Sequence, residues 1–321
     1  MKNKNIIVSA ILILLIIIGV GFRYMANNHP DKLINTTDSV QFKNVIFSNE
    51  SHSADVVVSE PVNPSRLGVI EIGSKGFNMF IVDVDRQGNW KLIVKEFGKS
   101  LAYEGFLTTE DVKSGLKNYL STMTDKGVAG KHCHFVVSSG ALKNPKTELI
   151  MNAISKMGYV VNKVTPEQEG TYALYSSLPK EYENRGFVVD IGGGNTKISW
   201  KTSSGIKSLE GPGAKYVQNG KTDEQVAQTI KSLVNQVPES AREYCFILGG
   251  VPMNLAKLNE TPRFQLLQNA SNYSFPKDDV YLNSGLNIYS AIQEVSPTSK
   301  YVFDWDTNFS IGFLINLISK K

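Results

Sequence analysis

The sequence contains only two cysteines in 321 residues, Cys133 and Cys245. Two thiols cannot build a disulfide framework or a four-cysteine zinc site, so both classes of protein are excluded. The 34 Lys and Arg nearly balance the 30 Asp and Glu, which excludes an acidic disordered chain and does not indicate a nucleic-acid-binding tail. The 12 prolines and 26 glycines follow no repeat, which excludes a collagen-like chain. Hydrophobic residues make up 41% of the chain, enough to fill a core, and the length predicts about two domains.

Long hydrophobic runs are also scarce, and the one that is present covers residues 6–22 with Ser9 as its only polar residue. A helix of this length would span about 25 Å, at the short end for a transmembrane segment. The bulky Tyr24 stands where a signal-peptide cleavage site usually has a small residue. We therefore expect an uncleaved transmembrane anchor over 1–23, with a cleavable signal peptide and a buried core helix as the alternatives.

The charges around this run predict an orientation. Lys2 and Lys4 precede it, and Arg23 and Lys32 follow it, which favours a cytoplasmic N-terminus by a small margin. This predicts a single-pass membrane protein whose body lies on the outer side, periplasmic or extracellular. Residues 24–65 are rich in Asn, Ser, Asp and Thr, and we expect them to form a flexible stalk.

From residue 67 onward, short apolar stretches alternate with amphipathic ones, as in a mixed α/β fold. The first half has predicted strands at 67–72, 78–84, 90–94, 134–138 and 159–164, with helices beginning at Thr108 and Asn144 and a further helix at 167–177. The second half has predicted strands at 186–191, 196–201, 205–209 and 244–248, with a helix at 222–237. The shared plan of strand, glycine turn, strand, strand, helix and strand predicts a duplicated α/β unit, with a ligand site where the two turns face each other.

Two turns carry the chemistry: residues 71–77 read EIGSKGF and residues 190–197 read DIGGGNTK. Each has a carboxylate, Glu71 or Asp190, at the end of a predicted buried strand, followed by glycine. Glycine lets the backbone N–H groups approach phosphate oxygens, and the carboxylates can hold the waters of Mg²⁺ or orient an attacking water. Either turn alone could be an ordinary tight hairpin, but the pair in corresponding places predicts a phosphate site.

The pair resembles the two phosphate loops of the actin, Hsp70 and sugar-kinase superfamily. It is more narrowly similar to the exopolyphosphatase and guanosine-pentaphosphate phosphohydrolase (Ppx/GppA) family, which has D-[IL]-G-S-N-S-F and D-I-G-G-G-S-T-E in these places. Further segments that match in order are SGALK at 139–143, PEQEG at 166–170, FILGGV at 246–251 and residues 301–314. The resemblance covers residues 67–321 and omits the C-terminal helical domains of longer members.

The resemblance implies a fold of two ribonuclease-H-like lobes, the actin-like ATPase arrangement, with a cleft between them. Lobe I would comprise residues 66–180, with 303–321 packing back on it, and lobe II residues 181–302. The resemblance assigns Glu169 as the catalytic residue that acts on the nucleophilic water, whereas by itself Glu169 would be a solvated carboxylate at a helix start. Glu71 and Asp190 would hold Mg²⁺. The substrate-binding residues it implies are Gly73, Ser74, Lys75, Lys143, Gly192, Gly193, Gly194, Asn195, Lys197, Gly249 and Gly250.

Four residues depart from the family pattern: Glu71 stands for Asp, Lys75 for Asn, Lys143 for Arg and Lys197 for Glu. Lys143 keeps the positive charge of arginine but loses its bidentate fork. Lys197 reverses a charge, which would weaken a Mg²⁺ site and strengthen direct binding of an anion.

We therefore expect a phosphoanhydride hydrolase that releases terminal phosphate from polyphosphate or guanosine pentaphosphate. The alternative is a catalytically impaired sensor or scaffold protein that binds phosphate, a polyanion or a nucleotide. An ATP-driven actin-like assembly protein is a weaker third interpretation. The expected partners are polyphosphate or a phosphorylated nucleotide, the membrane through one helix, and a second copy in a homodimer, with no nucleic acid.

Overall fold

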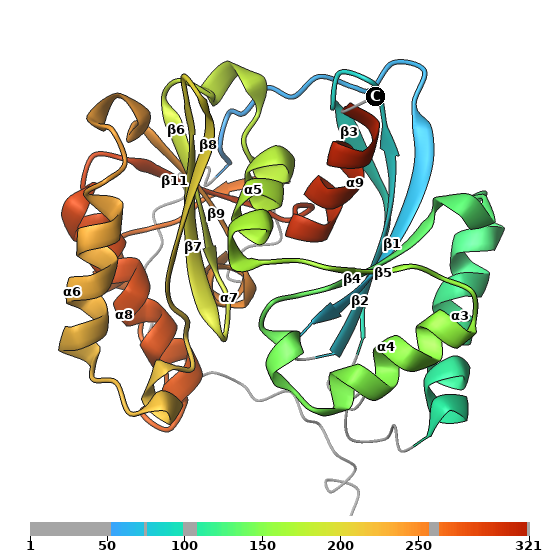
Figure 1. The fold of residues 1–321 in the computed structure, drawn as a ribbon. Coiled ribbons are helices and arrows are strands. Elements are labelled where there is room, and N and C mark those ends of the chain that lie inside the picture. The colour runs from blue at the N-terminus through green and yellow to red at the C-terminus, as the bar shows by residue number, and fades with distance from the viewer. Residues whose placement is uncertain (1–52, 74–75, 99–107, 257–262, 320–321) are drawn as a thin grey trace, which may run out of the picture. The chain divides into compact units, whose positions relative to one another are not determined.

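The computed structural model describes residues 53–73, 76–98, 108–256 and 263–319 (Figure 1). The predicted anchor at 1–23 and most of the predicted stalk lie outside these residues. Among the described residues, no helix is long and apolar enough to cross a membrane. The prediction of a single-pass membrane protein with an outward-facing body is corrected accordingly, because no spanning helix in the described structure supports it.

The first sheet contains β1 (Ser65–Gly73), β2 (Gly76–Val84), β3 (Trp90–Phe97), β4 (Cys133–Val137) and β5 (Val161–Lys163) in the order β3-β2-β1-β4-β5. β2 pairs antiparallel with both β1 and β3. On the other side of β1, β4 pairs parallel with β1, and β5 pairs parallel with β4. β1 is buried along most of its length. This burial explains why most of its residues are apolar, since a central strand is covered on both faces.

The second sheet contains β6 (Gly186–Ile191), β7 (Asn195–Thr202), β8 (Gly205–Pro212), β9 (Tyr244–Leu248), β10 (Phe264–Leu266) and β11 (Lys300–Asp304). Its order is β10-β11-β9-β6-β7-β8. β6, β7 and β8 form an antiparallel meander, and β9 and β11 continue parallel from β6. The plan of the first sheet is thus repeated, with a short antiparallel strand, β10, added at one edge. The predicted α/β fold with two sheets is confirmed.

Helices α3 (Thr109–Asp125) and α4 (Lys146–Lys156) belong to the first half, and α6 (Asp223–Val234), α7 (Gly250–Ala256) and α8 (Val280–Val295) belong to the second. The capping box predicted at Thr108 is confirmed, because its hydroxyl accepts a hydrogen bond from the backbone N–H three residues ahead, and Thr222 caps α6 in the same way. The sequence pattern predicted α6 to extend to residue 237, but it ends at Val234. It did not predict α8.

Helices α5 (Pro166–Ser177) and α9 (Phe309–Ser319) lie between the two sheets (Figure 1). α5 packs on β6, β7 and β8, α9 packs on β1 and β2, and the two helices pack against each other. A Cβ atom placed on Gly312 would lie 1.7 Å from the backbone oxygen of Tyr172, so only glycine permits this close crossing. The apolar core around these helices contains residues from both sheets, including Val69, Phe80, Val188, Phe246 and Ile311. α5 therefore connects the two halves, and it carries Glu169.

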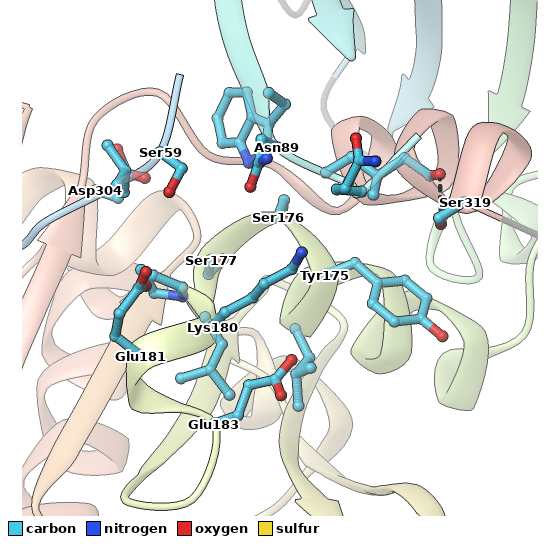
Figure 2. Close-up of a pocket in the computed structure, with 18 of the residues that line it drawn as sticks. Ser59, Asn89, Tyr175, Ser176, Ser177, Lys180, Glu181, Glu183, Asp304 and Ser319 are labelled. Atoms are coloured by element: carbon cyan, nitrogen blue, oxygen red, sulfur yellow. Dashed lines mark hydrogen bonds between the residues drawn. The ribbon is translucent and has the colours of Figure 1, made fainter. Parts of the chain in front are cut away.

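Residues 53–64, the described end of the predicted stalk, lie along the body. Ala54 N donates to Phe264 O at 3.1 Å, and Val62 N donates to Asp85 Oδ2 at 3.1 Å. The segment thus contacts the edge of the second sheet and the β2–β3 turn of the first. A cavity of about 220 Å³ lies beside it, with Ser59, Asn89 and the end of α5 in its wall (Figure 2). No residue of either glycine turn lines this cavity.

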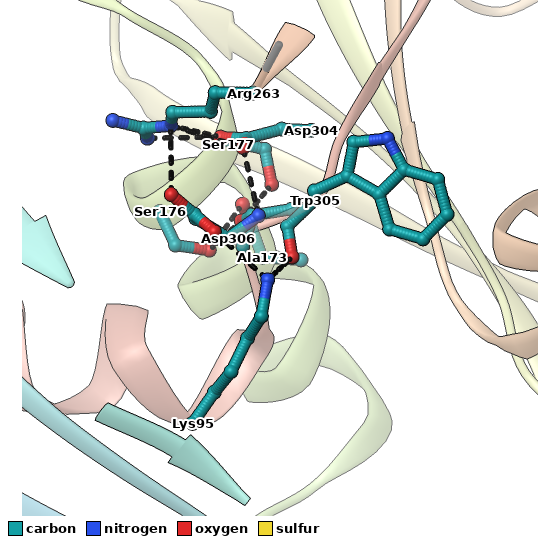
Figure 3. Close-up of polar contacts among 9 residues, drawn as sticks. Lys95, Ala173, Ser176, Ser177, Arg263, Asp304, Trp305 and Asp306 are labelled. Carbon is teal, nitrogen blue, oxygen red and sulfur yellow. Dashed lines mark hydrogen bonds and ion pairs between the residues drawn. The ribbon is translucent and has the colours of Figure 1, made fainter. Parts of the chain in front are cut away.

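Polar contacts near the end of α5 also join the halves (Figure 3). Lys95 Nζ on β3 lies 3.0 Å from Asp306 Oδ1 and donates to Trp305 O at 3.0 Å, and both acceptors follow β11. The Arg263 guanidinium pairs with buried Asp304 at 2.9 Å. These contacts hold the segment after β11 in place, and that segment leads directly into α9.

Candidate functional site

The two carboxylates of the glycine turns occupy equivalent places in their hairpins. Glu71 near the end of β1 is directly opposite Asn78 on β2, and Asp190 near the end of β6 is directly opposite Lys197 on β7. Residues directly opposite in an antiparallel pair project to the same face of the sheet. The strand register therefore places an amide beside the first carboxylate and an ammonium beside the second.

Lys197 joins two of the predicted site carboxylates. Its Nζ lies 2.5 Å from Glu169 Oε2 and 3.6 Å from Asp190 Oδ2. Glu169 also accepts hydrogen bonds from Ser139 N at 2.5 Å on Oε1 and from Ser139 Oγ at 3.0 Å on Oε2. Glu169 is 1% exposed and Lys197 6% exposed, so the ion pair is sealed from solvent. Both oxygens of the predicted catalytic carboxylate are thus engaged by protein groups.

The electrostatics of this cluster keep Lys197 charged. Burial alone would favour the neutral amine, but the charges of Asp190 and Glu169 outweigh it and raise the pKa of Lys197 above its ordinary value. Burial raises the pKa of Asp190, although Lys197 opposes this change. A buried ammonium is therefore held among buried carboxylates over the physiological pH range.

Glu71 has a different environment. Burial raises its pKa to about 7, and the nearby charges of Glu169 and Asp190 act in the same direction. Its Oε2 accepts hydrogen bonds from Asn78 Nδ2 at 3.0 Å and from Asn308 Nδ2 at 3.2 Å, which oppose the rise. Asn308 comes from the segment just before α9, so the C-terminal part of the chain contributes to the first turn.

The residues do not fit a Mg²⁺ ion in this arrangement. Mg²⁺ requires near-octahedral oxygen ligands, and no cluster of three or more potential His, Cys, Asp or Glu ligands occurs in the part of the chain that the structure describes. The Lys197 ammonium lies beside Asp190 and against Glu169, and it would repel a divalent cation there.

The second glycine turn is held by the segment that follows β8. Ala214 N donates to Gly192 O at 2.9 Å, and Lys215 N donates to Gly193 O at 2.8 Å. A Cβ atom on Gly213 would lie 2.3 Å from Asn195 N, so glycine is required where this segment crosses the turn. The Asn195 side chain donates to Glu210 Oε1 at 2.8 Å and to Ser139 Oγ at 3.3 Å. Its amide is therefore part of the buried network.

The backbone of this turn offers hydrogen-bond donors. Within the described ranges, neither Gly193 N nor Gly194 N donates to another protein group. Gly194 is exposed, and a Cβ atom placed on it would lie 3.8 Å from Gly140 Cα, beside Ser139. Adjacent backbone N–H groups of this kind suit an anion.

The remaining predicted residues lie at varying distances from this cluster. Gly249 follows β9, and a Cβ atom on it would lie 2.9 Å from Asp190 Oδ1, whereas one on Gly250 would lie 3.0 Å from the Tyr281 hydroxyl. A Cβ atom on Gly73 would lie 3.0 Å from Glu71 Oε1. Lys143 is exposed on the short 3₁₀ turn Ala141–Lys143. Ser74 and Lys75 lie outside the described residues.

Known structures share this fold. No protein-family profile matches the sequence, and no curated protein matches it significantly. A crystal structure of the Aquifex aeolicus member of the Ppx/GppA protein family matches 80% of this chain and 98% of its own, with a TM-score of 0.59 and 19% identity. The exopolyphosphatase from Cytophaga hutchinsonii matches 80% of this chain and 98% of its own, with a TM-score of 0.55 and 15% identity.

This chain has the Ppx/GppA fold. The resemblance read from the glycine turns is thus confirmed for the fold.

Three residues of the site were given no role by the sequence reasoning. Ser139 lies in one of the matched segments, and it holds both oxygens of Glu169. Asn78 could have been found from the hairpin, because it is the register partner of Glu71. Asn308 had no such signal, since only the docking of α9 brings it to the first turn.

Proposed function

We propose that the protein binds a phosphoanhydride polyanion, either polyphosphate or a phosphorylated nucleotide such as guanosine pentaphosphate, and hydrolyses it slowly or not at all. The similar solved structures suggest the ligand class, since they are a Ppx/GppA family member and an exopolyphosphatase. The observation that carries the proposal is the buried ion pair between Lys197 and Glu169.

This ion pair opposes general-base catalysis by Glu169. A general base must lie within hydrogen-bond reach of the water that it deprotonates. The Glu169 carboxylate is 1% exposed and is occupied by Ser139 and Lys197. Withdrawing Lys197 would leave buried charges unpaired, at a cost of about 3–5 kcal/mol. The arrangement therefore favours binding over turnover.

Hydrolysis of the terminal phosphoanhydride is the second candidate. It is favoured by the presence of Glu169 and Asp190 in the places where the family resemblance puts the catalytic and metal-binding carboxylates. In this mechanism a water beside Glu169 attacks the terminal phosphorus, the bond to the bridging oxygen breaks, and the shortened chain leaves with that oxygen. Glu169 accepts the proton of the water.

Titration calorimetry of the full-length chain with polyphosphate, guanosine pentaphosphate and ATP, run beside a phosphate-release assay, separates the two candidates. We expect binding of at least one ligand without Mg²⁺, and a release rate well below the 1 s⁻¹ or more that is typical of enzymes. Turnover in that typical range would overturn the binding proposal. A drop of about 10²–10⁴-fold in Glu169→Gln would then assign Glu169 as the base.

Lys197→Glu sharpens this test, because it restores the carboxylate that the family pattern has at this position. We expect it to weaken metal-free ligand binding and to raise Mg²⁺-dependent phosphate release. The matched control is Lys201→Glu, a charge reversal on the same strand at an exposed lysine that pairs with Glu183. Equal effects of the two variants would show that net charge alone is responsible.

A further inference from the structure

We propose that Lys215, together with the backbone N–H groups of Gly193 and Gly194, forms the site that binds the negatively charged phosphate chain. This inference rests on the proposed function and names the residue that recognises the ligand. Lys215 lies outside both glycine turns in the sequence, and only the fold brings it to the second one.

The geometry places the Lys215 side chain along the turn. Its backbone N donates to Gly193 O at 2.8 Å, which fixes the start of the side chain. A Cβ atom placed on Gly193 would lie 3.5 Å from Lys215 Cε and 3.7 Å from Lys215 Cδ. Because Nζ is bonded directly to Cε, the ammonium stays beside the turn that carries the two N–H groups.

The charge of Lys215 is available to a ligand. Among the described residues, no carboxylate forms an ion pair with it, and the residue is only half-buried. Lys197, in contrast, is buried and directs its charge onto Glu169 and Asp190. The two lysines near the second turn therefore have different roles. Lys197 neutralises the buried carboxylates, and Lys215 presents its charge toward the solvent.

Tyr281 in the first turn of α8 also lies beside Gly193. A Cβ atom on Gly193 would lie 3.6 Å from Tyr281 Cε2, so the aromatic ring and the Lys215 stem both lie close to this residue. Burial, with the charges of Asp190 and Asp279, raises the pKa of Tyr281 to about 12. Its hydroxyl is thus neutral at physiological pH and adds no negative charge that would repel phosphate.

The buried carboxylates of Asp190 and Glu169 determine how deep in the site the phosphate can bind. Asp190 and Glu169 repel a phosphate group from the interior, and Lys197 is already committed to them. The ammonium of Lys215 and the two N–H groups attract it at the rim of the turn. Because a lysine acts as a point charge, it suits a flexible phosphate chain better than a ligand that needs bidentate geometry.

The test uses Lys215→Met, which removes the charge and keeps an apolar side chain against Gly193. In titrations of the full-length chain with polyphosphate, we expect binding to weaken about 10- to 100-fold, the range for losing one charged hydrogen bond. The slope of log Kd against log salt should fall by about one, as for one lost lysine–phosphate contact. Lys215→Arg should bind within a few-fold of wild type.

Lys180→Met is the matched control. Lys180 is an exposed lysine that precedes β6, at the opposite end of that strand from the glycine turn. Its loss should leave Kd unchanged. Thermal melting of each variant separates a folding defect from a binding defect. If Lys215→Met does not fold, Gly194→Asp tests the same site, since its Cβ has room and its carboxylate would repel the ligand at the two N–H groups.

The outcomes separate this inference from the proposed function. Wild-type affinity in Lys215→Met, or in Gly194→Asp, overturns the role of Lys215 and the Gly193 and Gly194 N–H groups. The proposal that the protein binds a polyanion would still stand. Failure of the wild-type chain to bind polyphosphate, guanosine pentaphosphate and ATP overturns both.

Discussion

The two glycine turns have the same backbone plan and opposite electrostatics. In the first, Glu71 is paired across the hairpin with Asn78, and burial raises its pKa to about 7. In the second, Asp190 is paired across the hairpin with Lys197, which stays charged. The Asn78 amide donates a hydrogen bond to Glu71 but carries no charge, whereas the Lys197 ammonium supplies a counter-charge to Asp190. The residue directly opposite the carboxylate thus decides how each turn balances its charge.

The largest expected effect comes from removing the counter-charge of the second turn. Lys197→Met should lower the free energy of unfolding by about 3–5 kcal/mol, because it leaves Glu169 and Asp190 buried without a cation. Urea unfolding at pH 7 measures this. Adding Glu169→Gln to the variant should recover part of the loss. A change below about 1 kcal/mol would mean that Lys197 is not inside the carboxylate cluster.

Glu71 in the first turn should make the free energy of unfolding depend on pH. Because the folded-state pKa of Glu71 is raised from 4.5 to about 7, the folded state holds this proton more tightly than the unfolded state does. Stability should therefore fall as the pH rises from about 4.5 to about 7, by about 3 kcal/mol for this group. Urea unfolding across this range should show a flatter profile for Glu71→Gln. An unchanged profile would contradict the assignment.

A smaller effect is expected from the packing of the second turn. Gly213→Ala places a Cβ atom 2.3 Å from Asn195 N and 2.6 Å from Gly192 O, both of them backbone atoms. We expect a loss of about 1–3 kcal/mol in the free energy of unfolding, with weaker polyanion binding. Gly194→Ala is the control for stability, because its Cβ has no neighbour nearer than 3.8 Å. Equal melting temperatures for the two variants would refute the close crossing.

The smallest expected effect is at the contact that joins β3 to the segment after β11 (Figure 3). Lys95 and Asp306 are 34% and 28% exposed, so solvent screens their ion pair. Lys95→Met should change the free energy of unfolding by about 1 kcal/mol or less. If it costs as much as Lys197→Met, then burial is not what distinguishes the second turn.

Local patterns predicted much of the fold. The apolar runs ending in glycine form β1 and β6, and α3 begins at the predicted Thr108 cap. The prediction missed α8, although the Asp279 side chain caps its start by accepting a hydrogen bond from Leu282 N. The membrane prediction rested on residues 6–22 alone, and no described helix supports it.

The sequence by itself determined the two hairpins, their glycine turns and the carboxylate at the end of each first strand, because these depend on neighbours a few residues apart. The length of the second glycine turn also implies the register of the β6–β7 hairpin, and that register places Lys197 beside Asp190. Only the tertiary structure decided that Glu169 on α5 completes an ion pair with Lys197, and that Asn308 and Lys215 reach the turns. These contacts join segments far apart in the chain. Their geometry depends on how α5 and α9 pack between two sheets, which local propensity and hydrophobic periodicity do not specify.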